Sequence, residues 1–246
     1  MTWAVTPNDL KLPELERFHL QFKSDPSSSV IANARDRWRD HDFFDIACTE
    51  PQKSRRAGES LSRFRYIAFH KPYGVLSQFT GEPDQRTLAE FGLPPGVYAA
   101  GRLDKDSEGL LVLSDDGPFI KRLLDPDHGH ARSYLVQVEG LPTLRDLQRL
   151  SGGVVIKGYR TKPCRAELLH EPPKVEARDP PIRARKAIPT SWVKITLNEG
   201  KNRQVRRMTA AIGFPTLRLL RVTMGKLGLE DLAQGSWRDV RRQDIL

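Results

Sequence analysis

Two continuous apolar runs with a charged loop between them form the clearest hydrophobic pattern in this chain. Residues 97–100 read VYAA and residues 110–113 read LLVL, and short apolar runs of this kind are typical of buried strands. The loop between the runs is bracketed by Gly101 and Gly109, and its charged side chains include Arg102, Asp104, Asp106 and Glu108. The glycines permit the sharp backbone turns that point such side chains outward. The spacing fits either a loop that carries chemistry or a solvated hairpin connection.

The rest of the pattern alternates between strand and helix signals. Apolar runs and period-two alternation predict strands at residues 66–69, 75–76, 133–139, 154–156, 164–169, 192–197 and 217–222. Helices are predicted after Thr87, where Glu90 has capping-box spacing, and at residues 118–124, 143–150 and 202–212. The hairpin-like spacing of the strands favours an antiparallel sheet.

The segment 202–212, which reads NRQVRRMTAAI, predicts an amphipathic helix with Asn202 as its N-cap and Gly213 at its end. Its apolar positions recur at helical spacing and form a core stripe. Arg206 borders this stripe and is expected to be half-buried. Arg203 and Arg207 are expected to point further outward.

Two segments lack a regular pattern. Residues 1–62 mix polar, charged and scattered aromatic positions and predict a poorly ordered extension, in which residues 30–44 could form one marginal docking helix. Order is expected from residue 63 to residue 246. Residues 171–189 form a long, proline-rich connection that is either an exposed linker or a basic arm that contacts RNA through Arg183, Arg185 and Lys186.

Charge and cysteine content narrow the class of protein. Forty basic residues stand against 31 acidic ones, and residues 1–64 are balanced, so the excess that suggests a polyanionic partner lies in residues 65–246. Cys48 and Cys164 have neither disulfide-framework nor zinc-ligand spacing. No apolar run reaches the length of a membrane span. We expect a cytoplasmic protein that does not enter a membrane.

Several segments resemble, in order, the motifs of the RsuA-type pseudouridine synthases. They are FHKPYGVLSQFTGE (69–82), GVYAAGRLDKDSEGLLVLSDDG (96–117), RSYLVQV (132–138), PPIRARKAIPTSW (180–192), EGKNRQVRRMTAAIGFPTLRLLR (199–221) and GSWR (235–238). The resemblance spans about residues 65–240. Many members begin with an S4 RNA-binding domain, which residues 1–64 do not resemble. This favours a subfamily that lacks the domain and modifies 23S ribosomal RNA.

The resemblance implies the α+β pseudouridine synthase fold, with a central, mostly antiparallel mixed sheet, flanking helices and an active-site cleft. It also implies an isomerisation of uridine that uses no cofactor and no metal. The family's nucleophile corresponds to Asp104, which attacks either the ribose C1′ or the uracil ring. Arg206 stands at the position of the family's salt-bridging arginine and would keep this carboxylate ionised in a dry pocket. Tyr134 matches the active-site tyrosine, which stacks on the uracil and could handle the C5 proton.

Binding residues follow from the same resemblance. Because the uridine must leave its stack, Arg102 is suited to fill the gap or grip a phosphate. Asp106 and Glu108 are expected to fix the loop. Contacts to the RNA backbone or to the active-site loop are expected from Lys71, Tyr73, Arg203, Arg207, Arg218 and Arg221. The expected partner is 23S rRNA or a large-subunit assembly intermediate, bound by a monomer.

Two other functions fit parts of the sequence. A magnesium-dependent phosphohydrolase would use Asp104 and Asp106 as a DxD loop, with Asp115 and Asp116 completing the metal site. It would require alternating parallel strands and helices. A non-catalytic RNA-binding or ribosome-assembly protein would keep the same basic surface without using the pocket.

Overall fold

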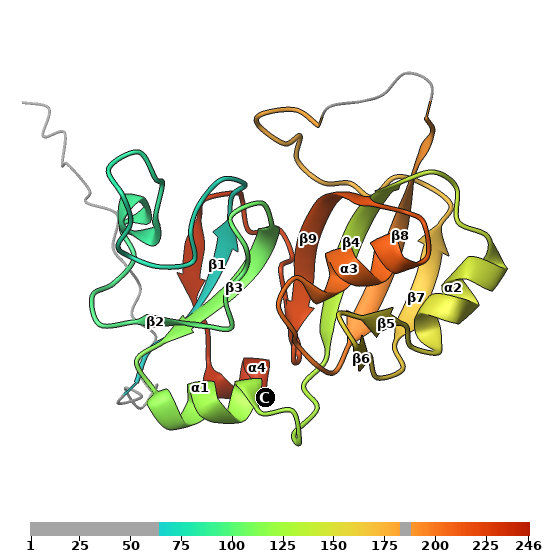
Figure 1. The fold of residues 1–246 in the computed structure, drawn as a ribbon. Coiled ribbons are helices and arrows are strands. Elements are labelled where there is room, and N and C mark those ends of the chain that lie inside the picture. Colours follow the sequence, from blue (N-terminus) through green and yellow to red (C-terminus); the bar gives the residue numbers. More distant parts are fainter. Residues whose placement is uncertain (1–63, 183–187) are drawn as a thin grey trace, which may run out of the picture. The chain divides into compact units, whose positions relative to one another are not determined.

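The computed structural model describes residues 64–182 and 188–246 (Figure 1). The predicted extension of residues 1–62, Cys48, and Arg183, Arg185 and Lys186 lie outside the described residues. The strands are β1 (Tyr66–Lys71), β2 (Tyr98–Ala100), β3 (Glu108–Ser114), β4 (Arg132–Glu139), β5 (Val155–Ile156), β6 (Tyr159–Arg160), β7 (Arg165–Leu169), β8 (Thr190–Leu197), β9 (Thr216–Met224), β10 (Leu227–Gly228) and β11 (Trp237–Asp239). The helices are the 3₁₀ helix η1 (Leu88–Phe91), α1 (Gly117–Leu124), α2 (Leu144–Ser151), α3 (Gln204–Ala211) and α4 (Arg242–Ile245).

The main sheet is mixed and mostly antiparallel, as predicted, with the strand order β11-β1-β3-β9-β4-β8-β7. β10 pairs with β9, and β2 pairs with β3. The parallel contact between β3 and β9 is short and joins Glu108 to Leu220 and Gly109 to Arg221. Two halves of the sheet therefore meet at the start of β3, directly after the charged loop.

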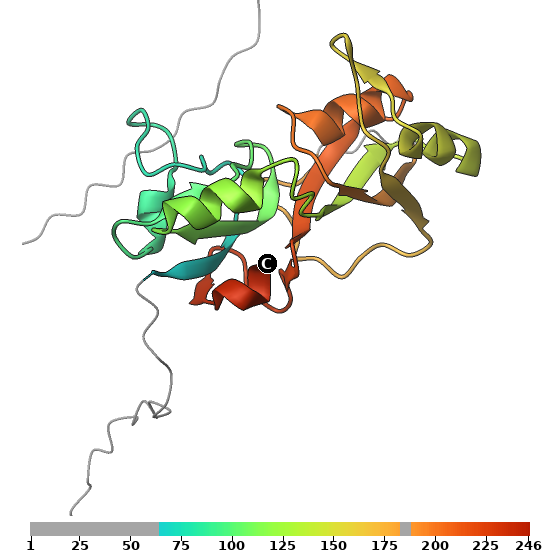
Figure 2. The same cartoon turned by 90° about the horizontal axis from the view of Figure 1, so that it is seen from below.

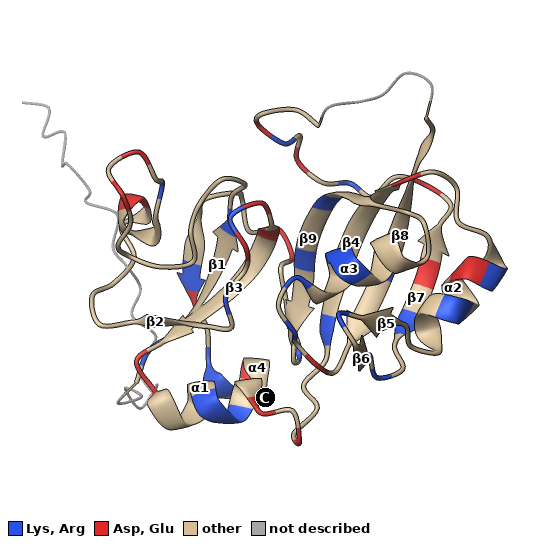
Figure 3. Cartoon of the chain, in the orientation of Figure 1, with Lys and Arg blue, Asp and Glu red and all other residues tan. Residues whose placement is uncertain are grey.

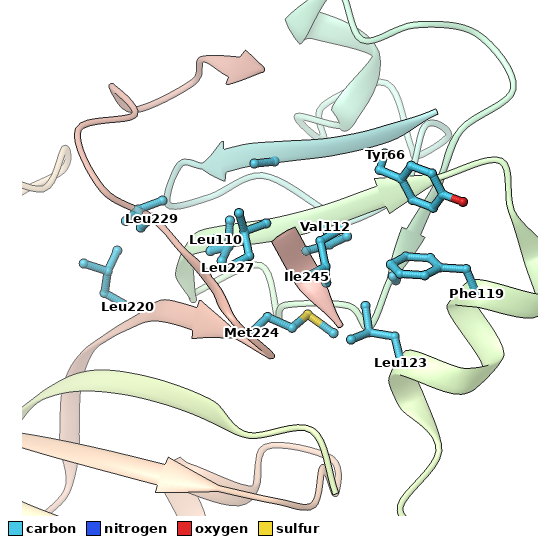
Figure 4. Close-up of a cluster of buried hydrophobic side chains, with 12 residues drawn as sticks. Tyr66, Leu110, Val112, Phe119, Leu123, Leu220, Met224, Leu227, Leu229 and Ile245 are labelled. Carbon is cyan, nitrogen blue, oxygen red and sulfur yellow. The ribbon is translucent and has the colours of Figure 1, made fainter. Parts of the chain in front are cut away.

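The first half of the sheet is buried on both faces, which explains why its strands are continuously apolar. In β1 and β3 the residues Ala68, Leu110 and Val112 face one hydrophobic cluster, together with Phe119 of α1 and Ile245 of α4 (Figure 4). The alternate residues of the same strands face a second cluster under η1: Ile67, Phe69, Leu111 and Leu113. Figures 1 and 2 show α1 and α4 beside this half of the sheet.

The second half packs against α2 and α3. Val136 and Val138 of β4 lie in one cluster with Val205 and Met208 of α3, so the predicted apolar faces of this strand and this helix meet. Tyr134 is partly buried and packs against the same cluster as Val136 and Val138. In the pairing of β4 with β9 it lies opposite Arg221. None of the helices within residues 64–182 and 188–246 combines the length and the hydrophobicity that crossing a membrane requires.

Two local predictions were wrong. Residues 75–76 are not a strand: Val75 is buried, and the amide of Leu76 donates to the carbonyl of Arg86 in a loop. Asn202 does not cap α3, because its Oδ1 accepts from Arg207 Nη2 (2.6 Å). Arg203 occupies the N-cap position with a φ of 50°.

Candidate active site

A pocket of about 450 Å³ opens where the charged loop meets β4, β9 and the start of α3. Its wall combines apolar side chains with both signs of charge. The lining residues include Leu124, Leu197 and Leu219, the acidic Asp104 and Glu199, the aromatic Tyr134, and the basic Arg102, Arg132, Lys201, Arg203 and Arg221. Figure 3 shows basic positions on β4, β9 and α3 around this region. The surplus of cations suits an anionic ligand.

Residues that follow β1 hydrogen-bond to the backbone of the loop that carries Asp104. Ser77 Oγ donates to the carbonyl of Leu103 (2.7 Å) and accepts from its amide (3.0 Å). The amide of Gly74 donates to the carbonyl of Lys105 (2.8 Å). Gly109, at a φ of 101°, closes the loop where any Cβ would lie 2.3 Å from the carbonyl oxygen of Arg221. These contacts fix the backbone of Asp104, whose side chain is one-third exposed.

The arginine that faces the Asp104 carboxylate is Arg203. Its Nη1 lies 3.4 Å from Asp104 Oδ2, and its guanidinium also makes a bidentate contact with the Asp106 carboxylate at 3.0 and 2.8 Å. Arg203 is exposed, and it reaches the charged loop from the start of α3, where its backbone is left-handed.

Arg206 reaches the loop one residue further along. Its Nη2 donates to the carbonyl of Asp106 (2.6 Å), and its Nε lies 3.4 Å from Asp106 Oδ2. The predicted half-burial is confirmed, since 13% of the side chain is exposed. The predicted direct pair with Asp104 is wrong in this structure, because α3 places Arg206 nearest to Asp106. Burial alone would raise the pKa of Asp106, but the hydrogen bonds from Arg203 and the charge of Arg206 hold it below the ordinary value.

Three cations predicted at the RNA surface are inside the protein. Arg218 pairs with Glu108 at 2.7 and 2.9 Å, with both side chains buried. Lys71 Nζ donates to the carbonyls of Ser107 (2.7 Å) and Pro72 (2.9 Å). Arg221 donates to the carbonyls of Leu110 (2.8 Å) and Gly101 (3.1 Å). Lys71 and Arg218 are buried and contact Ser107 and Glu108 of the charged loop, the other contact that was predicted for them. Arg221 is also buried but borders the pocket.

Lys71 gives the fold a measurable pH dependence. Burial lowers its pKa from an ordinary value of 10.5 to about 7, although Glu108, Asp106 and Asp104 oppose the shift. Between about pH 7 and pH 10.5 the unfolded chain therefore binds more protons at this residue than the folded chain. The contribution of Lys71 to stability rises with pH across that window, by up to about 1.4 kcal/mol per pH unit.

We expect Lys71→Met to remove this rise. Urea unfolding of the variant and of the unchanged protein, measured from pH 6.5 to pH 10, gives the difference in their free energies of unfolding. That difference should grow in favour of the unchanged protein as the pH rises. Lys226→Met, which removes an exposed ammonium that binds a C-terminal carbonyl, should leave the difference flat. A flat difference for Lys71→Met as well would contradict the lowered pKa.

Tyr134 lies in the pocket wall opposite Arg221 in the pairing of β4 with β9. Arg102 also lines the pocket and is exposed. Tyr73 is half-buried in the turn after β1, where the guanidinium of Arg178 lies 4.3 Å from its ring centroid. Arg207 is half-buried beside Asn202 and does not line the pocket. RNA contacts by Arg102, Tyr73 and Arg207 stay predictions.

Sequence reasoning missed the network that holds the far wall of the pocket. Glu199 is buried and accepts from Tyr159 Oη (2.7 Å), the amide of Lys162 (2.9 Å) and Gln204 Nε2 (2.6 Å). Burial would raise the pKa of Glu199, but these hydrogen bonds keep it low. The network ties the β5–β6 hairpin to the start of α3. Arg132, at the start of the RSYLVQV segment, was also missed; its place in a recognised motif was the available signal.

Asp115 and Asp116, which a phosphohydrolase would need as metal ligands, make structural hydrogen bonds instead. Asp116 Oδ1 caps α1 by accepting from the amide of Phe119 (3.0 Å), and its Oδ2 accepts from Tyr66 Oη (2.6 Å). Asp115 accepts from the amide of Arg65 (2.7 Å). Neither residue lines the pocket with Asp104. Together with the mostly antiparallel sheet, these contacts argue against the phosphohydrolase.

Comparisons with known proteins agree with the geometry. Residues 65–211 match the family model of RNA pseudouridylate synthases. Over 174 residues the chain is 54% identical to ribosomal large subunit pseudouridine synthase E of Xanthomonas campestris pv. campestris, which covers 70% of this chain and 93% of the relative. The protein of the same name from Vibrio vulnificus is 51% identical over 181 residues, covering 74% and 77% of the two chains.

A solved structure described as a pseudouridylate synthase superposes with a TM-score of 0.61 at 27% identity. The superposition covers 75% of this chain and 73% of the other. The fold, the matched family model and these relatives lead to one conclusion: the chain belongs to the RNA pseudouridylate synthase family, in its RsuA-type branch, and is an isomerase of ribosomal RNA.

Proposed function

We propose that the protein converts one uridine of 23S ribosomal RNA to pseudouridine with Asp104 as its nucleophile. By likeness to the E-type relatives, the proposed target is uridine 2457. The observation that carries the proposal is the convergence of Asp104, Tyr134, Arg203 and Arg221 on one pocket, because these residues come from three motifs far apart in the sequence. A pocket of about 450 Å³ has ample room for an extruded nucleotide.

The proposed chemistry follows from the environment of each group. The Asp104 carboxylate attacks the ribose C1′ or the uracil ring, and the glycosidic bond to N1 breaks. The freed base turns over in the pocket and C5 bonds to the ribose C1′, while the covalent bond to Asp104 breaks and restores the carboxylate. C5 loses its proton to solvent, and N1 gains one from solvent. The guanidinium of Arg203, 3.4 Å from Asp104, places a positive charge beside the attacking carboxylate. Tyr134 supports the base by stacking.

The experiment combines release of the C5 proton with mapping of the product. Purified protein is incubated with a 23S rRNA transcript that carries 5-tritiated uridine, and released tritium is counted. The modified site is then located by carbodiimide treatment and reverse transcription. The same mapping is applied to rRNA from a strain that lacks the gene, with and without the restored gene.

The expected result is stoichiometric tritium release and one pseudouridine that appears with the restored gene. Binding of the transcript without tritium release would favour the non-catalytic RNA-binding alternative. Pseudouridine at another position of 23S rRNA would support the proposed reaction but show that uridine 2457 is not the target. If no pseudouridine depends on the gene in the cell or forms in the purified reaction, the proposed function is wrong.

Arg206→Ala should lower both the rate and the stability. The guanidinium holds the Asp106 carbonyl and lies beside the Asp106 carboxylate, so its loss frees the loop and leaves a half-buried charge with one partner fewer. We expect a loss of about 1–3 kcal/mol in the free energy of unfolding and at least about tenfold in single-turnover rate. Urea unfolding and tritium release measure the two effects. An unchanged melting point and rate would contradict this role.

A further inference from the structure

Arg132 and Arg221 are buried arginines that line the pocket, and neither has a carboxylate within 4 Å among the described residues. Arg221 uses its Nε and its Nη2 on two backbone carbonyls. Arg132 begins β4 and is 7% exposed. Its Nη2 donates to the carbonyl of Leu123 at the end of α1 (3.2 Å), which fixes the plane of the guanidinium. Its Nη1 lies on the pocket side of this contact, 3.7 Å from where a Cβ on Gly200 would be.

No carboxylate neutralises Arg132 among residues 64–182 and 188–246. Arg218 pairs with Glu108, and Arg206 pairs with Asp106, but no acidic oxygen of the described residues lies within 4 Å of Arg132. The two acidic residues of the pocket wall are engaged elsewhere: Asp104 faces Arg203, and the oxygens of Glu199 accept from Tyr159, Lys162 and Gln204. A buried guanidinium without a counter-charge is costly unless a ligand supplies the charge.

Two histidines precede Arg132 in the sequence, and neither of them lines the pocket. His130, two residues earlier, stacks on His128 with ring centroids 6.0 Å apart. Its Nε2 is buried and has no hydrogen-bond partner within the described part of the chain. Burial and the charges of His128, Arg132 and Arg122 all lower the pKa of His130. Asp125 is the acidic neighbour, and it contacts His128 (3.2 Å).

We propose that Arg132 binds a backbone phosphate next to the flipped uridine. A nucleotide that enters the pocket carries its 5′ and 3′ phosphates to the rim, and a fixed planar guanidinium can hold two oxygens of one phosphate. Arg132 comes from the α1–β4 side, whereas Asp104 comes from the loop between β2 and β3. The phosphate contact would thus hold the nucleotide from an element separate from the loop that carries the nucleophile. This inference rests on the proposed function.

The test removes the charge from either partner. Short target RNAs are made with a neutral methylphosphonate at the phosphate 5′ or 3′ to the target uridine. Their dissociation constants are measured with the unchanged protein, Arg132→Gln, Arg132→Lys and the control Arg238→Gln. Arg238 is an exposed arginine on β11 that pairs with Glu230 and does not line the pocket. Tritium release from unmodified RNA is measured in parallel, with thermal melting as the folding check.

Arg132→Gln should weaken binding of unmodified RNA by about tenfold or more and lower the slope of log affinity against log salt by about one. One of the two methylphosphonates should weaken binding to the unchanged protein by a similar factor and have no further effect on Arg132→Gln. Arg132→Lys should keep the salt slope but bind less tightly, because a lysine lacks the fork. Arg238→Gln should match the unchanged protein.

The inference is overturned if both methylphosphonates weaken Arg132→Gln by the same factors as the unchanged protein, because the effects of two partners in one contact do not add. If Arg132→Gln does not fold, the same comparison is made with the neutral variant Arg132→Met, and equal factors again overturn it. Failure of the proposed function is distinguishable, since the unchanged protein would then release no tritium from the unmodified RNA.

Discussion

Asp104→Asn should abolish pseudouridine formation while leaving RNA binding nearly intact. The amide has the shape of the carboxylate but lacks the negative charge that makes the oxygen a nucleophile, so single-turnover tritium release should fall by about a thousandfold or more. Asp104 is held in place by its backbone, through Ser77 at Leu103 and Gly74 at Lys105. The substitution should therefore change the melting temperature little.

Asp115→Asn is the matched control for this variant. Asp115 is an exposed aspartate that accepts from the amide of Arg65 and lies outside the pocket. It should keep full activity with the same change of charge. The dissociation constant of the RNA should be similar for both variants, because Arg203 and the other pocket cations remain. Turnover by Asp104→Asn within about tenfold of the control would remove the role given to this carboxylate.

Glu108→Gln should cause the largest loss of stability among single polar substitutions. The Glu108 side chain is fully buried and makes two hydrogen bonds with Arg218, 6% of whose side chain is exposed. Removing one charge leaves the other buried without its partner, which costs about 3–5 kcal/mol. The free energy of unfolding in urea measures the loss.

Asp239→Asn provides the surface counterpart. Asp239 receives two hydrogen bonds from Arg65 Nη2 at 2.9 and 3.1 Å, but the two side chains are 60% and 45% exposed. Asp239→Asn should lower the free energy of unfolding by at most about 1 kcal/mol. The double variant Glu108→Leu with Arg218→Met should recover much of the stability that Glu108→Gln loses, since neither charge remains. If Glu108→Gln and Asp239→Asn lower the free energy of unfolding equally, burial does not determine how much the Glu108–Arg218 pair contributes to stability.

Strand and helix positions were largely predictable because local chemistry specifies them. Thr87 and Glu90 form the expected capping box at η1, and Pro118 lies in the first turn of α1 behind the cap Asp116. The continuous apolar runs at β1 and β3 became strands buried on both faces. The resemblance placed Asp104 and Tyr134 in the same site, and both line one pocket.

The pairing of charges was not predictable, because it depends on which side chains the fold brings within a few ångströms. Arg218 alternates with leucines on β9, as a half-exposed arginine would, yet it meets Glu108, 110 residues away in the sequence, inside the protein. Arg206 was expected to hold Asp104, but the left-handed backbone at Arg203 brings that arginine to the carboxylate. Local sequence thus determined the strands, the helices and the motif that supplies the nucleophile. The tertiary structure alone decided which arginine faces each carboxylate and which cations are buried, because the energy of a charge depends on distance and solvent access that no single segment contains.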